Sequence, residues 1–385
     1  MKKLILNTIV VALFVISLSC TKKEVVLTAP MITTTDVNVL NDTSVTSGGN
    51  ITSNGGSPIS LRGIVWDISS NPTVILSTKT NDGSGIGTFN SSISSLKPAT
   101  TYYIRAYATN TVGTSYGNEV IFKTKVGLPK VTTDIASLIT PESATSGGNV
   151  TSDGGASIIS NGIVWSETTN PTISVKTKSI NTGKLGAFIN KIDSLLPDKT
   201  YYIRAYATNT VGTSYGNEVI FKTKQLTIGY KYAGGVVAYL LQIGDKGYDA
   251  NIQHGIISAT EDQSEGIHWY NGSNITTNAT KTDLGSGFEN TNKIILSQGP
   301  ISTNYAAGLA RSYNGGGFND WFLPSKDELN ILFTNRSLIG KFTTSTYWSS
   351  SEVAGNYVYI QNFTAGGQYS DWKYFLLYVR AIRYF

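Results

Sequence analysis

The sequence has almost no cysteine, few histidines and little charge. Cys20 is the only cysteine in 385 residues, so the chain cannot form an internal disulfide bond. Charged residues make up 14% of the chain, and the net charge is +5. Residues 225–385 hold 11 Lys and Arg against 12 Asp and Glu, which is not the basic footprint of a nucleic-acid-binding protein. No nucleic-acid partner is therefore expected.

Residues 1–19 are predicted to be a signal peptide. Two lysines precede a largely apolar stretch, residues 4–16, which is too short to span a bilayer comfortably. Residues 17–20, Ser-Leu-Ser-Cys, resemble the signal of bacterial lipoproteins, in which the cysteine becomes the lipidated N-terminus. The resemblance implies that Cys20 is lipidated. The alternative is an ordinary signal peptide with a chance cysteine.

The lipoprotein resemblance also implies a location. Residues 20–29 would form a lipidated tether, with the membrane as a partner through the N-terminal lipid. Thr21 stands where an inner-membrane retention signal would place Asp. We therefore expect an outer-membrane lipoprotein of a Gram-negative bacterium, exposed at the cell surface.

An internal repeat with a period of 99 residues precedes the C-terminal part. The segment TYYIRAYATNTVGTSYGNEVIFKTK occurs at 101–125 and again, unchanged, at 200–224. The repeat predicts two tandem domains, residues 30–125 and residues 126–224. The 39 glycines and 22 tyrosines of the chain favour strands and turns over helices. The fold class expected is mostly β.

The repeated unit resembles a fibronectin type III domain. Tyr102, Ile104, Ala106 and Ala108 alternate with Tyr103, Arg105 and Tyr107, as in a half-buried strand. The run LKPATTY at 96–102 is similar to the corner that such domains pin with a tyrosine hydroxyl. The resemblance implies two β-sandwiches of fibronectin or immunoglobulin type that act as a spacer.

Trp66 and Trp165 occupy matching positions in the two copies of this unit. Flanking Ile and Val residues favour a place in the core for both side chains. A carbohydrate platform built on the two tryptophans is the alternative.

Residues 225–385 differ from the repeats in their pattern of apolar and polar residues. Short apolar runs at 234–240 and 255–258 flank a polar turn, which predicts a hairpin. Helices are expected at 306–313 and from Ser325 onward, where Ser325 and Glu328 form a capping box. From Tyr347 the pattern returns to strands. A small α+β domain is therefore expected at the C-terminal end.

Five phrases in this part resemble the Lcl C-terminal family of bacterial adhesins. They are GGVVAYL, QHGIISA, GGFNDWFLPSKDELN, YWSSSE and YVRAIRYF. The resemblance implies a fold similar to C-type lectins and formylglycine-generating enzymes. It also implies that the first and last strands of the domain pair, so that residues 378–383 form a central strand.

Four short islands interrupt the family phrases near the C-terminus. They are residues 353–357, 364–365, 369–371 and 374–377, and each fits codons derived from AAC by replacement of adenines. This placement resembles the variable proteins of diversity-generating retroelements. The codon for Trp372 cannot arise from AAC by replacement of adenines, so this residue would not vary. A core role for Phe375 and Leu377 is the alternative at those two positions.

The resemblance implies a ligand-binding surface on these islands. Tyrosine and tryptophan with Ser, Asn and Asp are the composition of antibody loops. We call the predicted set the contact patch: Asn356, Tyr357, Tyr359, Thr364, Tyr369, Ser370, Asp371, Trp372, Tyr374, Phe375 and Leu376. The partner expected is a protein or glycan on another cell, phage or host surface. A fixed-specificity adhesin that binds polysaccharide is the alternative.

The sequence offers little for catalysis. It has no HExxH, GxSxG or P-loop motif. No catalytic residue or cofactor is therefore expected. No metal is expected either, because the Asn319-Asp320-Trp321 run differs from the motifs of calcium-dependent lectins. A hydrolase is the remaining alternative, and it would have to use residues among His254, His268, Asp327 and Glu328.

Overall fold

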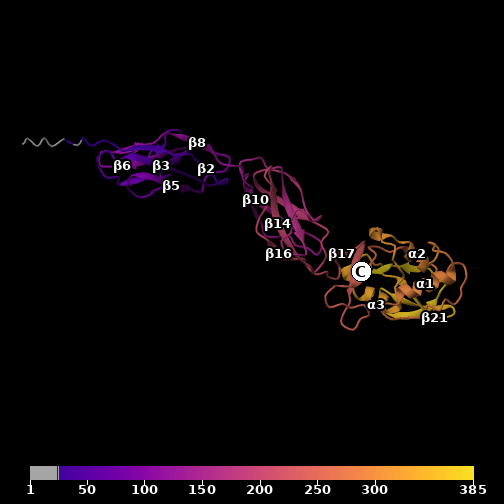
Figure 1. Cartoon of the computed structure of the whole chain (residues 1–385). Coiled ribbons are helices and arrows are strands. Elements are labelled where there is room, and N and C mark those ends of the chain that lie inside the picture. Colours follow the sequence, from indigo (N-terminus) through magenta and orange to yellow (C-terminus); the bar gives the residue numbers. More distant parts are fainter. Residues whose placement is uncertain (1–23, 25) are drawn as a thin grey trace, which may run out of the picture.

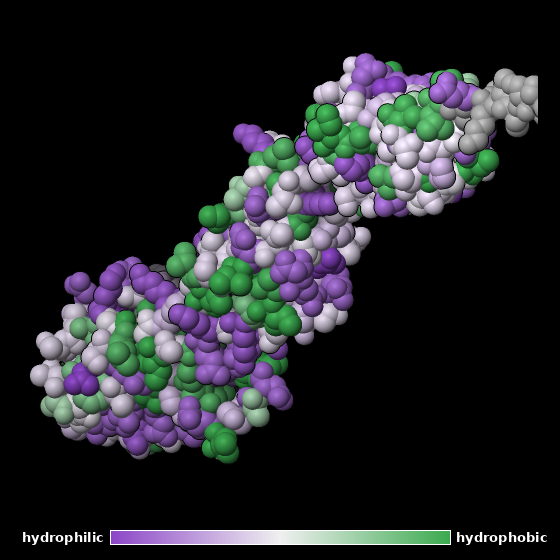
Figure 2. Space-filling view, turned by 90° about the vertical axis from the view of Figure 1, so that its left-hand side faces the viewer, coloured by the Kyte–Doolittle hydropathy of each residue, from purple (hydrophilic) through white to green (hydrophobic). Residues whose placement is uncertain are grey.

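The structure is a computed structural model that describes residue 24 and residues 26–385. Figure 1 shows three successive parts: two composed of strands, then a C-terminal part that carries all the helices of the described chain. In Figure 2 the same parts form three lobes, with apolar surface gathered over the middle one. The expected signal peptide and Cys20 lie outside the described residues. Within the described range, no helix has the length and apolar character needed to span a membrane.

The first part consists of two antiparallel sheets around a shared core. One sheet has the order β1-β3-β2 with β5 also paired to β3, and the other has β4-β6-β7 with β8 also paired to β6. Its strands are β1 (Met31–Thr34), β2 (Asn38–Val39), β3 (Val45–Ser53), β4 (Leu61–Asp67), β5 (Gly87–Ile93), β6 (Thr101–Thr109), β7 (Thr114–Tyr116) and β8 (Val120–Lys123). One cluster of apolar side chains, including Ile64 and Ile104, fills the space between the sheets.

The second part repeats this arrangement. One sheet has the order β13-β10-β9, and the other has β12-β11-β14-β15 with β16 paired to β14. The strands are β9 (Lys130–Thr133), β10 (Ala144–Ser152), β11 (Ser160–Ser166), β12 (Asn181–Thr182), β13 (Gly186–Ile192), β14 (Thr200–Thr208), β15 (Thr213–Tyr215) and β16 (Val219–Lys222). The predominantly β character expected from the sequence is confirmed.

A tyrosine pins the same corner in both copies. The Tyr102 hydroxyl accepts a hydrogen bond from the backbone N–H of Lys97 at 3.0 Å. The Tyr201 hydroxyl accepts one from Leu196, also at 3.0 Å. The alternation expected for β6 fails at Tyr107, which is buried because its hydroxyl donates to the carbonyl of Thr80 at 2.6 Å.

The tryptophans expected in the cores are only partly buried. Trp66 and Trp165 pack against the cluster of apolar side chains in their own copy, but neither is enclosed. Each lies one residue before the end of its strand, β4 or β11, where the covering sheet no longer surrounds a large side chain.

The C-terminal part has two sheets with helices packed on them. The four-stranded sheet has the order β17-β18-β19-β25, and the five-stranded sheet has the order β20-β24-β21-β22-β23. The strands are β17 (Lys231–Tyr232), β18 (Gly235–Leu240), β19 (Gly255–Ser258), β20 (Ser264–Ile267), β21 (Thr346–Ala354), β22 (Tyr357–Asn362), β23 (Gln368–Trp372), β24 (Leu377–Val379) and β25 (Ile382–Tyr384). The helices are α1 (Gly287–Gln298), α2 (Ala306–Ser312), α3 (Lys326–Thr334), α4 (Arg336–Ile339) and the short 3-10 helix η1 (Gly315–Gly317).

The predicted hairpin and the two predicted helices are confirmed. Strands β18 and β19 pair antiparallel across the 241–254 turn. Helix α2 matches the expected segment, and α3 begins after the capping box at Ser325. The Glu328 carboxylate accepts the backbone N–H of Ser325 at 2.7 Å, while Ser325 Oγ accepts that of Glu328 at 3.3 Å. Helix α1 was not predicted.

The prediction of a single central strand over residues 378–383 is wrong. The chain breaks there into β24, which runs parallel to β21, and β25, which pairs with β19 at the edge of the other sheet. The break has a physical cause: Arg380 turns inward, and its guanidinium donates to Asp262 at 2.7 Å and to the carbonyl of Ala259 at 3.0 Å. The first strands of this part, β17 and β18, therefore do not pair with the last one.

Candidate functional site

The contact patch lies on a hairpin at the edge of the five-stranded sheet. Strand β22 pairs with β21 on one side and β23 on the other, and β23 is the last strand. The register places Tyr357 opposite Trp372 and Tyr359 opposite Ser370. Val358 and Ile360 point to the opposite face and are buried in the core of this part. Tyr357 and Tyr359 thus lie on the outer side of β22, but the alternation fails at Gln361, which is fully buried.

All eleven residues of the contact patch are accessible. Tyr359, Asp371 and Trp372 are half-buried, and the other eight are exposed. Phe375 is 39% exposed, which contradicts the core alternative at that position, whereas Leu377 is half-buried against the core.

Four aromatic side chains of the patch form a continuous row, which we call the aromatic row. The ring centroids of Tyr357 and Trp372 are 4.5 Å apart, and those of Trp372 and Tyr374 are 5.7 Å apart. Phe375 extends the row, with its centroid 4.8 Å from that of Tyr374. Successive rings are inclined by 39°, 29° and 44°. The row therefore holds each ring in place through its neighbours.

A second group of contacts joins the hairpin to helix α3. The Lys326 ammonium lies 5.1 Å from the centre of the Tyr359 ring, in a cation–π contact. The side chain of Gln368 donates to the carbonyl of Lys326 at 2.7 Å. These contacts fix the middle of β22 and the start of β23 against the first turn of the helix.

A buried ion pair lies beneath the aromatic row. The Lys373 ammonium and the Glu352 carboxylate are in direct contact, and both side chains are fully buried. The carboxylate also accepts the backbone N–H groups of Thr277 at 2.9 Å and Asn278 at 2.8 Å. The ammonium donates to the carbonyl of Ile275 at 3.0 Å and lies 4.7 Å from the centre of the Trp269 ring. Every charge of the pair is thus compensated, as a buried ion pair requires.

The backbone around this pair is fixed as well. The Lys373 N–H donates to the carbonyl of Asn356 at 3.0 Å, and the Trp269 N–H donates to the carbonyl of Lys373 at 3.1 Å. On the surface the side chain of Asn274 donates to that of Asn356 at 3.0 Å. We call this set of contacts around Lys373 and Glu352 the frame. It holds two patch segments, 356–357 and 372–375, in a fixed relation.

The turn between β22 and β23 is shaped by polar side chains and a glycine. Asn362 Oδ1 accepts the backbone N–H groups of Thr364 at 2.8 Å and Ala365 at 2.9 Å. The Gln361 side chain donates to the carbonyl of Gly366 at 2.8 Å. Gly366 has φ +83°, and a Cβ atom there would come within 2.6 Å of the Phe333 ring, so only glycine fits.

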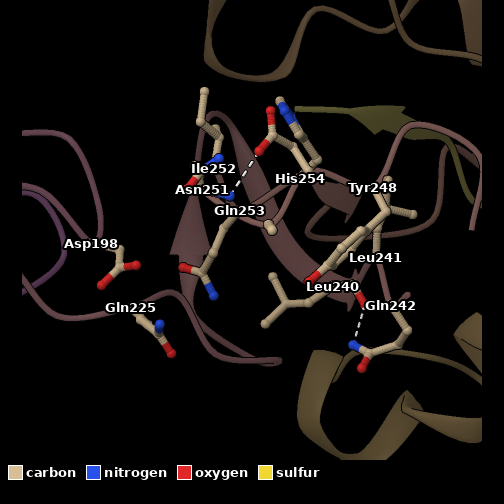
Figure 3. Close-up of a pocket in the computed structure, with 12 residues that line it drawn as sticks. Asp198, Gln225, Leu240, Leu241, Gln242, Tyr248, Asn251, Ile252, Gln253 and His254 are labelled. Atoms are coloured by element: carbon tan, nitrogen blue, oxygen red, sulfur yellow. Dashed lines mark hydrogen bonds between the residues drawn. The ribbon is translucent and has the colours of Figure 1, made fainter. Parts of the chain in front are cut away.

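A recess at the start of the C-terminal part lies away from the contact patch. Figure 3 shows a cavity of about 350 Å³ with Asp198 and Gln225 on one side and residues 240–254 on the other. Gln253 on its wall exchanges hydrogen bonds with the backbone of Leu226, at 2.7 Å and 3.3 Å. No residue of the contact patch lines this cavity.

Three of the four residues of the hydrolase alternative have structural partners, and Asp327, the fourth, is exposed. The ring of His254 shares a hydrogen bond with the carbonyl of Phe385 at 3.1 Å, and His268 stacks on Tyr270. Burial raises the pKa of the Glu328 carboxyl, which caps α3 and accepts the Tyr384 hydroxyl. Over residues 24 and 26–385, no group of three or more His, Cys, Asp and Glu side chains could hold a metal ion. That the chain is not an enzyme stays a prediction.

The frame was not predicted as a unit. The sequence separates Glu352 from Lys373 by a full hairpin, and the ion pair forms only when β21 and the 373–376 loop meet.

Comparisons with known proteins bear on the fold. No family model matches the chain, and no curated protein matches it. The fibronectin domains FN1–FN3 of chicken CNTN1 are similar in structure, with a TM-score of 0.32 and 17% identity over 51% of this chain and 66% of that one, just under two thirds. The sensor domain of the anti-sigma factor RsgI4 of Pseudobacteroides cellulosolvens matches with a TM-score of 0.22 and 24% identity, over 26% of this chain and 100% of its own. Both matches are too weak to carry a functional argument.

Proposed function

We propose that this chain is a surface-displayed lipoprotein that binds a ligand through the contact patch. In this proposal two fibronectin-like sandwiches hold a domain of C-type-lectin type away from an outer membrane, to which lipidated Cys20 tethers it. The observation that carries the proposal is the placement of the eleven patch residues: all are accessible, on one edge hairpin and the loop that follows it, over a buried frame.

The aromatic row favours a protein ligand over a glycan. Sugar rings bind by stacking on free aromatic faces. Here each ring of the row already contacts at least one other aromatic ring, at centroid distances of 4.5–5.7 Å. Tyrosine-rich surfaces of this kind supply large contact area at low entropic cost in protein recognition.

The burial pattern supports diversification of the islands. Residues 353–357, 364–365 and 374–376 are exposed, whereas residues that interrupt the islands, such as Val358, Ile360 and Lys373, are buried. Replacement of these exposed island residues would therefore leave the core unchanged, whereas Leu377 of the last island packs against the core. We propose that the chain is a variable protein of a diversity-generating retroelement. Sequencing the gene from many isolates tests this: variation should concentrate at the islands, beside a reverse-transcriptase gene and a near-copy of the last codons.

Binding is tested with a patch variant and a matched control. The patch variant carries Tyr357→Ser, Tyr374→Ser and Phe375→Ser. The control variant carries Ile243→Ser, Tyr248→Ser and Leu296→Ser, which replace residues of the same part that are 87%, 39% and 87% exposed. Both variants and the parent chain are applied to an array of purified bacterial and phage surface proteins and to a glycan array.

We expect binding to one or a few proteins that the patch variant loses and the control variant keeps. Loss in both variants, or in neither, would contradict the proposal. Binding to a single sugar class that does not change with residues 353–377 would instead support a fixed-specificity polysaccharide adhesin.

A further inference from the structure

Each of the two sandwiches has an unpaired strand edge at the same position, but the side chains around the two edges differ. Strand β5 pairs only with β3, and its counterpart β13 pairs only with β10. An unpaired strand edge is a template for pairing with another chain unless it is protected. The two copies therefore allow the protection of one edge to be compared with that of the other.

The edge of the first copy is covered by an arginine. The Arg62 guanidinium lies 5.1 Å from the centre of the Phe89 ring on β5. It also donates to the carbonyls of Asp82 at 3.2 Å, Gly85 at 3.1 Å and Ile86 at 3.3 Å. A charged side chain thus lies across this edge, and Phe89 beneath it is buried.

The second copy lacks this protection. Asn161 stands where Arg62 stands in the first copy, and its buried Oδ1 atom has no hydrogen-bond partner within the described chain. Asn181 and Asn190 exchange side-chain hydrogen bonds at 3.0 and 2.9 Å, which places β12 beside β13. Phe188, the counterpart of Phe89, is only half-buried.

The second copy also carries exposed apolar side chains in or next to β11, β12 and β13. Ile159, Ile180, Leu185 and Ile189 are 60%, 68%, 57% and 75% exposed. Their counterparts in the first copy are Ser60, Asn81, Ile86 and Asn90, so three of the four positions are polar there. Since the first copy forms the same sandwich without them, the fold does not require these apolar residues. All four are exposed residues of the second copy, the middle one of the three parts.

We propose that β13 is a dimerisation edge that pairs antiparallel with β13 of a second copy of this chain. Two-fold symmetry then centres the pair on Ile189, which lies opposite its own equivalent. In that register Lys191 lies opposite Ala187 and Phe188 opposite Asn190, so no charge faces a like charge. The edge is thus complementary to itself.

The partner surface is small. It consists of four apolar side chains and one strand edge, whereas a standard stable interface involves roughly 800 Å² and about 20–30 residues per partner. The dimer is therefore weak in dilute solution and depends on concentration, as it would on a crowded surface.

Site-directed cross-linking tests the register. The experiment uses residues 24–385, which contain every described element and no cysteine. An Ile189→Cys variant should form a disulfide-linked dimer under mild oxidation, because paired strands bring such Cα atoms to about 4.5–5.5 Å. An Asn90→Cys variant, at the matched position of the first copy, should remain monomeric. Equal cross-linking of both variants, or none with Ile189→Cys, would overturn the proposal.

Sedimentation tests the association without a cross-link. The unmodified 24–385 chain should show a rising fraction of dimer as its concentration increases. Ile189→Arg should abolish that rise, and Asn90→Arg should leave it unchanged. Because residue 189 is 75% exposed, the variant should keep the circular dichroism spectrum of the parent. A chain that stays monomeric at every concentration would contradict the proposal.

Discussion

The contact patch and the frame beneath it occupy the same stretch of chain but follow opposite rules. Tyr374 is 47% exposed, while Lys373, its neighbour in sequence, is fully buried in an ion pair. The patch consists of side chains that touch one another at the surface. In the frame, each buried charged group needs a specific partner. This difference indicates that side chains of the contact patch can be replaced without loss of folding stability, as long as the frame beneath them is kept.

Loss of the buried carboxylate should have the largest effect. Glu352→Ala leaves the Lys373 ammonium buried without its partner, so unfolding free energy should fall by about 3–5 kcal/mol. Urea unfolding of residues 24–385 measures this. Asp193→Ala, which removes an ion pair whose side chains are 68% and 55% exposed, is the control and should cost less than about 1 kcal/mol. Similar losses in the two variants would show that the frame contributes no more than a surface pair.

The glycine of the β22–β23 turn should give the next largest effect. Gly366→Ala combines a left-handed backbone with a clash against the Phe333 ring, so the loss should be about 2–4 kcal/mol. Gly355→Ala shares the positive φ, +44°, but its Cβ would meet no atom within 4 Å, so about 1–2 kcal/mol is expected. Thermal unfolding of both variants separates the clash from the backbone cost. An equal loss would exclude any role for the contact with Phe333.

The cap of α3 should make stability depend on pH. Burial raises the pKa of Glu328 in the folded state, so the folded protein holds this proton more tightly than the unfolded chain. The contribution is fully present below the unfolded pKa of about 4.3 and is lost as pH rises through the raised folded pKa. Glu328→Gln keeps a capping residue without the titration, so its melting temperature should fall less over that range. Parallel curves for the two proteins would contradict this assignment.

Removal of a patch residue should have the smallest effect on folding. Tyr374→Ser replaces an exposed ring, and the unfolding free energy should change by less than about 0.5 kcal/mol. The comparison with Glu352→Ala, in the same part of the chain, sharpens the contrast between patch and frame. A loss above about 2 kcal/mol would place Tyr374 in the frame.

The sequence predicted most elements because local signals determine them. The capping box at Ser325 and Glu328 and the tyrosine corner at Tyr102 both depend on residues close in sequence. The break at Arg380 and the pairing of Glu352 with Lys373 depend on contacts across 118 and 21 residues, and no local pattern specifies them. Helix α1 was missed because Thr, Asn and Ser dilute its apolar face.

A library measurement tests most directly whether the patch is a replaceable surface on a fixed frame. Two libraries of the chain are displayed on phage: one randomises Tyr357, Tyr369, Ser370, Tyr374 and Phe375, and the other randomises Glu352, Val358, Ile360, Gln361 and Lys373. The fraction of members that resist protease is then counted. We predict that most of the first library and almost none of the second remain resistant. Equal loss of resistance in both libraries would contradict the separation of patch and frame.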